Sequence, residues 1–395
     1  MLAERTALLK HSDSAAAWTA AKAAIVSGEQ IIDLTAEEIR SDLPPMVCEG
    51  TIIAINRSIN GDTETGAATK LREAIARRIS SETGQPWSMD EVAVTSGSKH
   101  ALFNAAMVLL NPRDEVLIPI PHWTSFPARV LMAGGVPIFI ETRDTKYVPK
   151  PSDLAAAVTS KTKAIVVSTP NNPTGTIYDR EILTEIAQLA AERDLWIVFD
   201  ESYGAFAHAP HTHHSIVSAA AEARHRTLIA NSLSKSLALT GWQIGYLAGP
   251  KSVIDAALAL QRDTGCTPDV TSQHALLHHL ESSDDVFQQK LQRQVSEART
   301  LGLSILSTLK SIPQPSAQGG FYFYLDIKGL RQSTKGPRPE FNADDVVNVL
   351  LNAGVAAASG TIFSDPDGVR LSYGIDLGSL DKGLRRLSVT LNTWN

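Results

Sequence analysis

The chain has 395 residues, of which 43% are hydrophobic and 20% charged, and its formal net charge at pH 7 is −6. This is the composition of a globular protein long enough for two domains, and an acidic chain without long runs of one charge is not typical of proteins that bind nucleic acid or an anionic membrane surface. Its apolar runs are too short to cross a bilayer, its N-terminus lacks the apolar core of a secretion signal, and two distant cysteines, Cys48 and Cys266, favour a reducing cytoplasm.

Short apolar segments recur along the first three quarters of the chain and predict β-strands. Seven such segments cover residues 91–97, 115–120, 136–141, 163–170, 195–201, 227–234 and 244–250. They are continuous rather than alternating, as expected of strands buried on both faces. Between them, residues 179–194 carry an apolar stripe at helical spacing. Strands and helices in alternation predict an α/β domain with a mostly parallel seven-stranded sheet, whose ligands bind beyond the carboxyl ends of the strands.

The pattern changes after about residue 290. A long polar helix is expected around residues 284–310, followed by "GGFYFYLDI" and "DDVVNVLLNAGVAAASG", which predict a smaller α+β domain. Residues 328–343 are rich in glycine, proline and charge and are expected to form an exposed loop. We therefore predict a large domain from residues 45–285, and a small domain made of residues 1–44 and 286–395.

Polar residues stand at the ends of several predicted strands. Gly97, Ser98 and Lys99 lie where a strand turns into a helix, and the N–H groups of a helix N-terminus can bind an anion. Asn172 lies in the turn "STPNNPTG", and Asp200 ends the strand of "VFDESY". Each feature also has a plainer explanation, namely a helix cap, a structural turn or a surface acid. A buried carboxylate is costly unless it is paired, however, so Asp200 is a candidate functional residue.

Taken together, these strand ends supply the groups that a pyridoxal cofactor needs. Lys235, in "SLSKSLALTGWQIGY", can form a Schiff base with an aldehyde. Asp200 can hold a pyridinium nitrogen protonated, and Asn172 can donate to a phenolate oxygen. Trp123, in "PIPHWTSFP", can stack on a flat ring. This set of groups predicts binding of pyridoxal 5′-phosphate.

The chain resembles the fold-type-I pyridoxal-phosphate enzymes of the class I/II aminotransferase family, which are similar to aspartate aminotransferase. The resemblance covers roughly residues 30 to 390. It rests on "TSGSKHALFNA", "IPIPHWTSFP", "STPNNPTG", "VFDESY", "SLSKSLALTGWQIGY" and "GVRLSYG", which stand in the family's order and at its spacings. It implies the two-domain aspartate aminotransferase fold. It also implies a homodimer with composite sites, because "INGDTETG" and the stretch around Cys266 match segments that reach the neighbouring subunit.

The resemblance also implies a role for each matching residue. Lys235 matches the Schiff-base lysine that moves the substrate's α-proton. Asp200 matches the partner of the pyridine nitrogen, and Asn172 and Tyr203 match the pair that binds the cofactor's O3′ oxygen. The group that cradles the phosphate is matched by Gly97, Ser98, Lys99 and Ser232, and the stacking ring by Trp123. Arg370 matches the arginine that grips the substrate's α-carboxylate through two hydrogen bonds, with Asn172 beside it.

Three positions depart from the family pattern. Gln243 stands where an arginine normally contacts the phosphate, and its amide can donate a hydrogen bond without adding charge. Gly61 stands near the place of a tyrosine that reaches a neighbour's phosphate. Glu37, in "DLTAEEIRSDLPP", falls near a glycine that faces the substrate. The differences at Gln243 and Gly61 are explained either by drift or by a specialised site. Glu37 is either a solvated acid or an acidic wall that selects a substrate with a distal positive charge.

The leading functional hypothesis is an aminotransferase that uses pyridoxal phosphate to exchange the amino group of an α-amino acid with a keto acid. The alternative is other chemistry of the same cofactor, such as elimination or replacement at Cβ or Cγ, cyclisation or oxidation. Such an enzyme would act on a cationic amino acid such as arginine or S-adenosylmethionine. The histidines of "HAPHTHHS" are expected to form a polar loop rather than a metal site, because no carboxylate or thiolate cluster accompanies them in the sequence.

Overall fold

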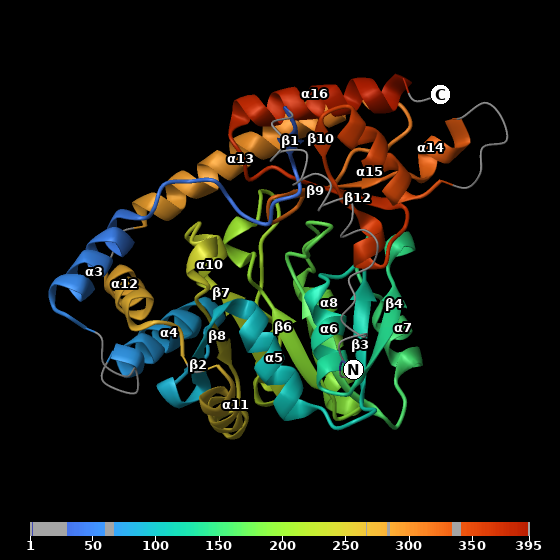
Figure 1. Cartoon of the computed structure of the whole chain (residues 1–395). Helices are drawn as coiled ribbons and strands as arrows, with labels where there is room; N and C mark the ends of the chain where they lie inside the picture. The colour runs from blue at the N-terminus through green and yellow to red at the C-terminus, as the bar shows by residue number, and fades with distance from the viewer. Residues whose placement is uncertain are drawn as a thin grey trace.

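The computed structural model describes residue 2 and residues 30–59, 67–265, 267–282, 285–333 and 341–393. Its largest sheet has seven strands in the order β2-β8-β7-β6-β5-β3-β4 (Figure 1). The strands are β2 (Val92–Thr95), β3 (Glu115–Ile120), β4 (Val136–Glu141), β5 (Thr162–Ser168), β6 (Trp196–Asp200), β7 (Thr227–Ser232) and β8 (Gly245–Ala248). Only β8 runs antiparallel to its neighbours. Each strand overlaps one of the predicted segments, so the mostly parallel seven-stranded sheet is confirmed.

Helices connect the strands and cover the sheet. They are α5 (Gly97–Leu109), α6 (Ser125–Met132), α7 (Pro151–Ala157), α8 (Arg180–Glu192), α9 (Ile216–Ala219), α10 (Leu233–Ser236) and α11 (Lys251–Thr264). Helix α8 confirms the helix expected over residues 179–194, and the carboxylate of Asp179 caps it by accepting a 2.9 Å hydrogen bond from the backbone N–H of Ile182. Its buried side includes Leu183 and Ile186, which pack into the core.

A second body of helices and strands lies above the large sheet in Figure 1. Its elements are α13 (Val286–Leu306), β9 (Tyr322–Asp326), α14 (Lys328–Ser333), α15 (Ala343–Asn352), β10 (Val355–Ala356), β11 (Ala358–Ser359), β12 (Gly368–Ser372) and α16 (Leu377–Thr393). Strands β11, β12 and β9 form an antiparallel sheet, and β1 (Ile32–Asp33) pairs with β10. Leu34 and Ile39 share one hydrophobic cluster with side chains of α13, α15 and α16. The domain boundaries after residues 44 and 285 remain our proposal.

The expected loop over residues 328–343 is wrong at its beginning, because residues 328–333 form helix α14. Leu330 is buried in the same hydrophobic cluster as α13 and α16. One buried leucine can anchor a short helix within a stretch whose average composition is that of a loop. Residues 334–340 lie outside the described part of the chain.

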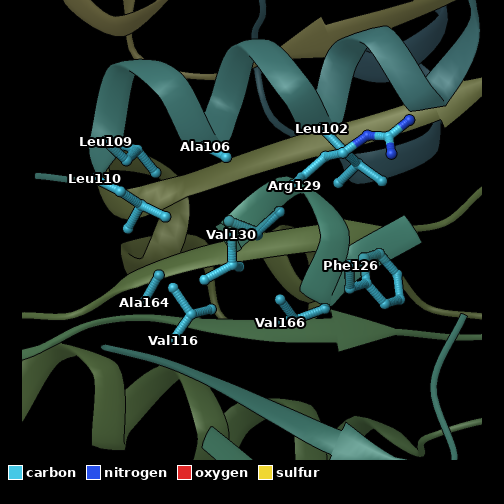
Figure 2. Close-up of a pocket in the computed structure, with 11 residues that line it drawn as sticks. Leu102, Ala106, Leu109, Leu110, Val116, Phe126, Arg129, Val130, Ala164 and Val166 are labelled. Carbon is cyan, nitrogen blue, oxygen red and sulfur yellow. The ribbon is translucent and has the colours of Figure 1, made fainter. Parts of the chain in front are cut away.

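The described residues contain three further helices: α3 (Pro45–Asn56), α4 (Ala67–Thr83) and α12 (Val270–Glu281). Helices α3 and α12 pack side by side at the left edge of Figure 1. No helix in the described ranges is long and apolar enough to cross a membrane. Figure 2 shows a small apolar cavity beneath α5 and α6, with side chains such as Val130 and Val166 in its wall. Its volume of about 30 Å³ leaves room for one or two water molecules, so an amino acid does not fit there.

Candidate active site

The predicted polar residues lie together at the carboxyl ends of the central strands of the large sheet. Asn172 follows β5, Asp200 ends β6, and Lys235 lies in α10 directly after β7. Strands β5, β6 and β7 are neighbours and run parallel, so their carboxyl ends lie together. Arg370 approaches from β12 of the antiparallel sheet. The site therefore lies where the two bodies meet.

The side chain of Lys235 is partly buried. Its Nζ donates a hydrogen bond to the main-chain oxygen of Glu37 and lies 5.9 Å from the centroid of the Tyr203 ring. Burial lowers the pKa of Lys235, and the nearby Glu37 carboxylate opposes that shift. A lysine with a lowered pKa has a larger neutral fraction, and the neutral amine is the form that attacks a carbonyl carbon.

Asp200 is a buried carboxylate, only 4% exposed. It accepts hydrogen bonds from the backbone N–H of Ser202 at 3.0 Å and from its hydroxyl at 2.7 Å. Burial raises the pKa of Asp200 to about 6. A cationic partner would stabilise the charged form, so the environment of Asp200 suits a protonated ring nitrogen.

Two tyrosines and an amide form a buried hydrogen-bond chain. The Nδ2 of Asn172 lies 3.5 Å from the hydroxyl of Tyr203, which is 2.9 Å from the hydroxyl of Tyr322. Burial raises the pKa of Tyr203, so its phenol stays protonated and can donate a hydrogen bond. We did not predict Tyr322 as a site residue. The signal was present in "GGFYFYLDI", because a tyrosine in a buried strand usually needs a partner for its hydroxyl.

Arg370 is 3% exposed and lies between two aromatic rings. Its guanidinium carbon is 4.6 Å from the ring centroid of Tyr322 and 4.9 Å from that of Phe363. Its Nη2 donates to the main-chain oxygen of Thr35 at 2.9 Å. This packing holds the planar guanidinium in one orientation, as two-point recognition of a carboxylate requires. Phe363 and Thr35 were also absent from our prediction.

Glu37 lies inside this arrangement. Its carboxylate accepts a 2.7 Å hydrogen bond from Nη1 of Arg370 and a 3.3 Å hydrogen bond from Nδ2 of Asn172. The same Nη1 also donates to Oδ1 of Asn172 at 2.8 Å. Burial alone would raise the pKa of Glu37, but Arg370 and Lys235 more than offset this and lower it to about 2. Glu37 is therefore ionised at neutral pH and forms an ion pair with Arg370.

A second group of predicted residues lies at the start of α5. Gly97 has φ +75°, a conformation that favours glycine, at the turn from β2 into α5. Gln243 lies beside it: a Cβ added to Gly97 would come within 3.3 Å of the Gln243 side-chain oxygen. The Gln243 side chain is exposed, and its Nε2 donates to the main-chain oxygen of Thr240. Ser98 is buried in the first turn of α5. The backbone N–H groups of this helix N-terminus and the side-chain amide of Gln243 therefore lie close together.

The remaining predicted residues line the same region. The Nζ of Lys99 lies 5.7 Å from the centroid of the Trp123 ring. Trp123 is partly buried, and its ring meets that of Phe126 edge-on at 5.8 Å. Ser232 is the last residue of β7 and is buried beside Gly245.

The donor set fits pyridoxal phosphate. Its ring nitrogen requires a buried carboxylate, and its aldehyde requires a lysine with a lowered pKa. Its O3′ oxygen requires donors such as an amide next to a phenol, and its phosphate requires a helix N-terminus, which here lies beside an exposed amide.

Gly61 and Cys266 are outside the described residues. His213 lies 3.3 Å from the carboxylate of Glu201, and His208 lies 2.9 Å from the main-chain oxygen of Gly320. In the part of the chain that the structure describes, no group of three or more histidine, cysteine, aspartate or glutamate residues could hold a metal ion.

Comparisons of the sequence and of the structure with known proteins all find aminotransferases. The sequence model of the family described as aminotransferase class I and II matches residues 29–387. Aspartate aminotransferase of Bacillus sp. (strain YM-2) is 32% identical over 98% of both chains. Aspartate/prephenate aminotransferase of Thermus thermophilus is 35% identical over 92% of both chains. The structure of aspartate aminotransferase from Thermus thermophilus with maleate superimposes with a TM-score of 0.91, at 33% identity over 99% of both chains.

Proposed function

We propose that this chain transfers the amino group of an α-amino acid by means of pyridoxal phosphate bound at the carboxyl ends of β5, β6 and β7. The chain belongs to the class I and II aminotransferase family. The observation that carries this proposal is the position of Lys235. Its amine is partly buried, has a lowered pKa and interacts electrostatically with Asp200 and Arg370.

Bound pyridoxal phosphate supplies an electron sink that stabilises negative charge on the substrate's Cα. Lys235 would hold the cofactor through its aldehyde carbon, and its amine would move the proton on the substrate's Cα. The burial that lowers its pKa keeps part of its amine neutral for this work. Asp200 would hold the ring nitrogen in its protonated form by charge pairing.

Other residues hold the two reactants in place. Asn172 and Tyr203 would orient the ring through its O3′ oxygen, and Trp123 would pack on it. The residues that would hold the phosphate are Gly97, Ser98, Lys99, Ser232 and Gln243. Arg370 receives the substrate's α-carboxylate, for which the flanking aromatic rings fix its guanidinium plane.

The relatives named above support an amino-group exchange between an α-amino acid and a 2-keto acid, because their names are those of aspartate and prephenate aminotransferases. The relatives named above are not named for the elimination, cyclisation or oxidation chemistry that the sequence left open. We therefore propose transamination as the reaction.

Borohydride reduction of the holoenzyme followed by peptide mapping tests the central assignment. We expect a pyridoxyl label on Lys235 and on no other lysine. Lys235→Ala should abolish both the label and keto-acid formation, whereas Lys251→Ala, at an exposed position in α11, should leave both unchanged. A label on another lysine, or keto-acid formation by Lys235→Ala, would refute the proposal.

A further inference from the structure

One residue contacts both ends of the proposed substrate site. The main-chain oxygen of Glu37 accepts from Nζ of Lys235, and its carboxylate accepts from Arg370 and Asn172. An amino acid bound for transamination has its amino group towards Lys235 and its carboxylate towards Arg370. The Glu37 carboxylate thus holds the position that the substrate's carboxylate needs. We call Nη1 of Arg370 and Nδ2 of Asn172 the Arg370 anion site.

The backbone on both sides of Glu37 is fixed. The N–H of Leu34 donates to the main-chain oxygen of Ala356 at 2.9 Å, and the N–H of Arg40 donates to that of Gly374 at 2.7 Å. Leu34 and Ile39 are buried in the hydrophobic cluster around α13. The Glu37 side chain itself is 30% exposed. A substrate can therefore displace the side chain by rotation while the segment stays in place, and the displaced carboxylate remains close to the substrate.

We infer that Glu37 determines the substrate class: it occupies the Arg370 anion site until an amino acid displaces it, and it then pairs with a cation on the side chain of that amino acid. The substrate class is α-amino acids with a distal ammonium or guanidinium group. This inference rests on the proposed function, because it takes Arg370 as the α-carboxylate site.

Charge balance supports a cationic side chain. The charges of Arg370 and Glu37 cancel in their ion pair. An incoming α-carboxylate takes away Arg370, the stronger of the two cations that lower the pKa of Glu37, and this loss in a partly buried place is unfavourable unless a new cation replaces Arg370. A side-chain carboxylate would bring a third negative group to the same place, whereas a side-chain cation restores the balance.

Lys99 is the cation that favours the opposite conclusion. It lies at the start of α5, over the Trp123 ring, and its positive charge contributes to lowering the pKa of Lys235. Its side chain is exposed, and the proposed function assigns it to the phosphate. Gln243, beside Gly97, brings no positive charge to the phosphate, so Lys99 is the residue that neutralises the phosphate there. Lys99 is therefore less available to bind the side-chain carboxylate of an acidic substrate.

Binding of unreactive carboxylates to the holoenzyme tests the inference without turnover. 4-Guanidinobutyrate, pentanoate and glutarate each carry a carboxylate but no amino group, so they cannot react with the cofactor. By isothermal titration calorimetry we expect the wild type to bind 4-guanidinobutyrate at least ten times more tightly than pentanoate or glutarate. In Glu37→Gln that preference should disappear, with weaker binding of 4-guanidinobutyrate and tighter binding of pentanoate.

Two variants control for side effects. Glu38 is exposed and follows Glu37 in the sequence, so Glu38→Gln removes the same charge from a neighbouring position. This variant should bind all three ligands as the wild type does. Glu37→Asp keeps the charge and should retain the preference. A preference that survives in Glu37→Gln, or equal tightening of all three ligands, would overturn the inference.

Turnover separates this inference from the proposed function. Lysine, ornithine, aspartate and leucine are supplied as amino donors to the wild type and to Glu37→Gln. If Lys235 carries the label and aspartate reacts best in both proteins, the proposed function stands and the role of Glu37 is wrong. If Lys235 carries no label, the proposed function itself fails.

Discussion

At the scale of single residues, the burial of Asp200 makes the cofactor-free protein less stable as the pH rises. Its folded-state pKa of about 6 lies above the ordinary 3.8. Between these values the folded state binds more protons than the unfolded state, so stability falls as the pH rises through this interval. By this linkage, the ionised carboxylate costs about 3 kcal/mol above pH 6.

We therefore predict that Asp200→Asn stabilises the cofactor-free protein at pH 7.5 by about 3 kcal/mol, and that this gain disappears near pH 4. Urea unfolding of both proteins across this pH range measures it. Asp194→Asn, at an exposed site, should show no such pH-dependent gain. The same Asp200→Asn change should weaken pyridoxal phosphate, because the ring nitrogen loses its charged partner. Equal stability of Asp200→Asn and wild type at pH 7.5 would show that Asp200 is not destabilised by its surroundings.

The ion pair of Glu37 and Arg370 predicts coupled effects on stability. Arg370→Leu leaves the Glu37 carboxylate without its 2.7 Å partner and should destabilise the protein by about 1–3 kcal/mol, since Glu37 is partly exposed. Adding Glu37→Gln should restore much of this loss. A double-mutant cycle by urea unfolding gives the coupling. Strictly additive effects would mean that the two side chains do not form a significant ion pair in solution.

At the scale of elements, the strands were predictable and the contacts between distant segments were not. Strands such as β5 and β6 are buried by helices on both faces, so they stand out as apolar runs in the sequence. Lys235 and Asp200 could be found because Asp200 is the last residue of β6 and Lys235 lies three residues after the end of β7. The ion pair of Glu37 and Arg370 joins residues 333 positions apart, and no local pattern encodes it. Tyr322 carried a local signal as a tyrosine in a buried strand, but its partners come from β12 and the turn after β6 and could not be predicted.

The turn between β2 and α5 makes a prediction about Gln243. This residue has φ +47°, its side chain is exposed, and it lies beside Gly97 at the helix N-terminus. An arginine can therefore replace it without displacing the core. We expect Gln243→Arg to tighten pyridoxal phosphate by about 1.5–3 kcal/mol, or roughly ten- to a hundredfold, through a charged hydrogen bond to the phosphate.

Fluorescence titration of the cofactor-free protein with pyridoxal phosphate measures this effect, and Gln243→Leu is the matched control because it keeps the size but removes the amide. An unchanged product and substrate range in Gln243→Arg would favour drift at this position. A changed product, or turnover that falls while the cofactor binds more tightly, would instead favour a specialised site.

At the scale of the whole molecule, helix α3 exposes an apolar surface that suggests where a second subunit binds. Ile52 and Ile55 are 58% and 63% exposed and lie three residues apart, on the same side of α3. Helix α3 packs against α12. The segments that the family resemblance assigns to the neighbouring subunit follow α3 and precede α12, although residues 60–66 and Cys266 lie outside the described residues. We propose that α3 contributes to a homodimer interface.

The dimer proposal predicts that Ile52→Asp with Ile55→Asp converts the protein to a monomer and lowers its activity with it. Burial of one isoleucine contributes about 1.5–3 kcal/mol, so loss of two should raise the dimer dissociation constant more than about a hundredfold. Sedimentation velocity at micromolar concentration measures the change. Val389→Asp, an equally drastic change at a 66% exposed position in α16, should leave the mass unaltered. If the site is shared between subunits, activity should fall in step with the dimer fraction on dilution. A fully active monomer would place the whole site within one chain.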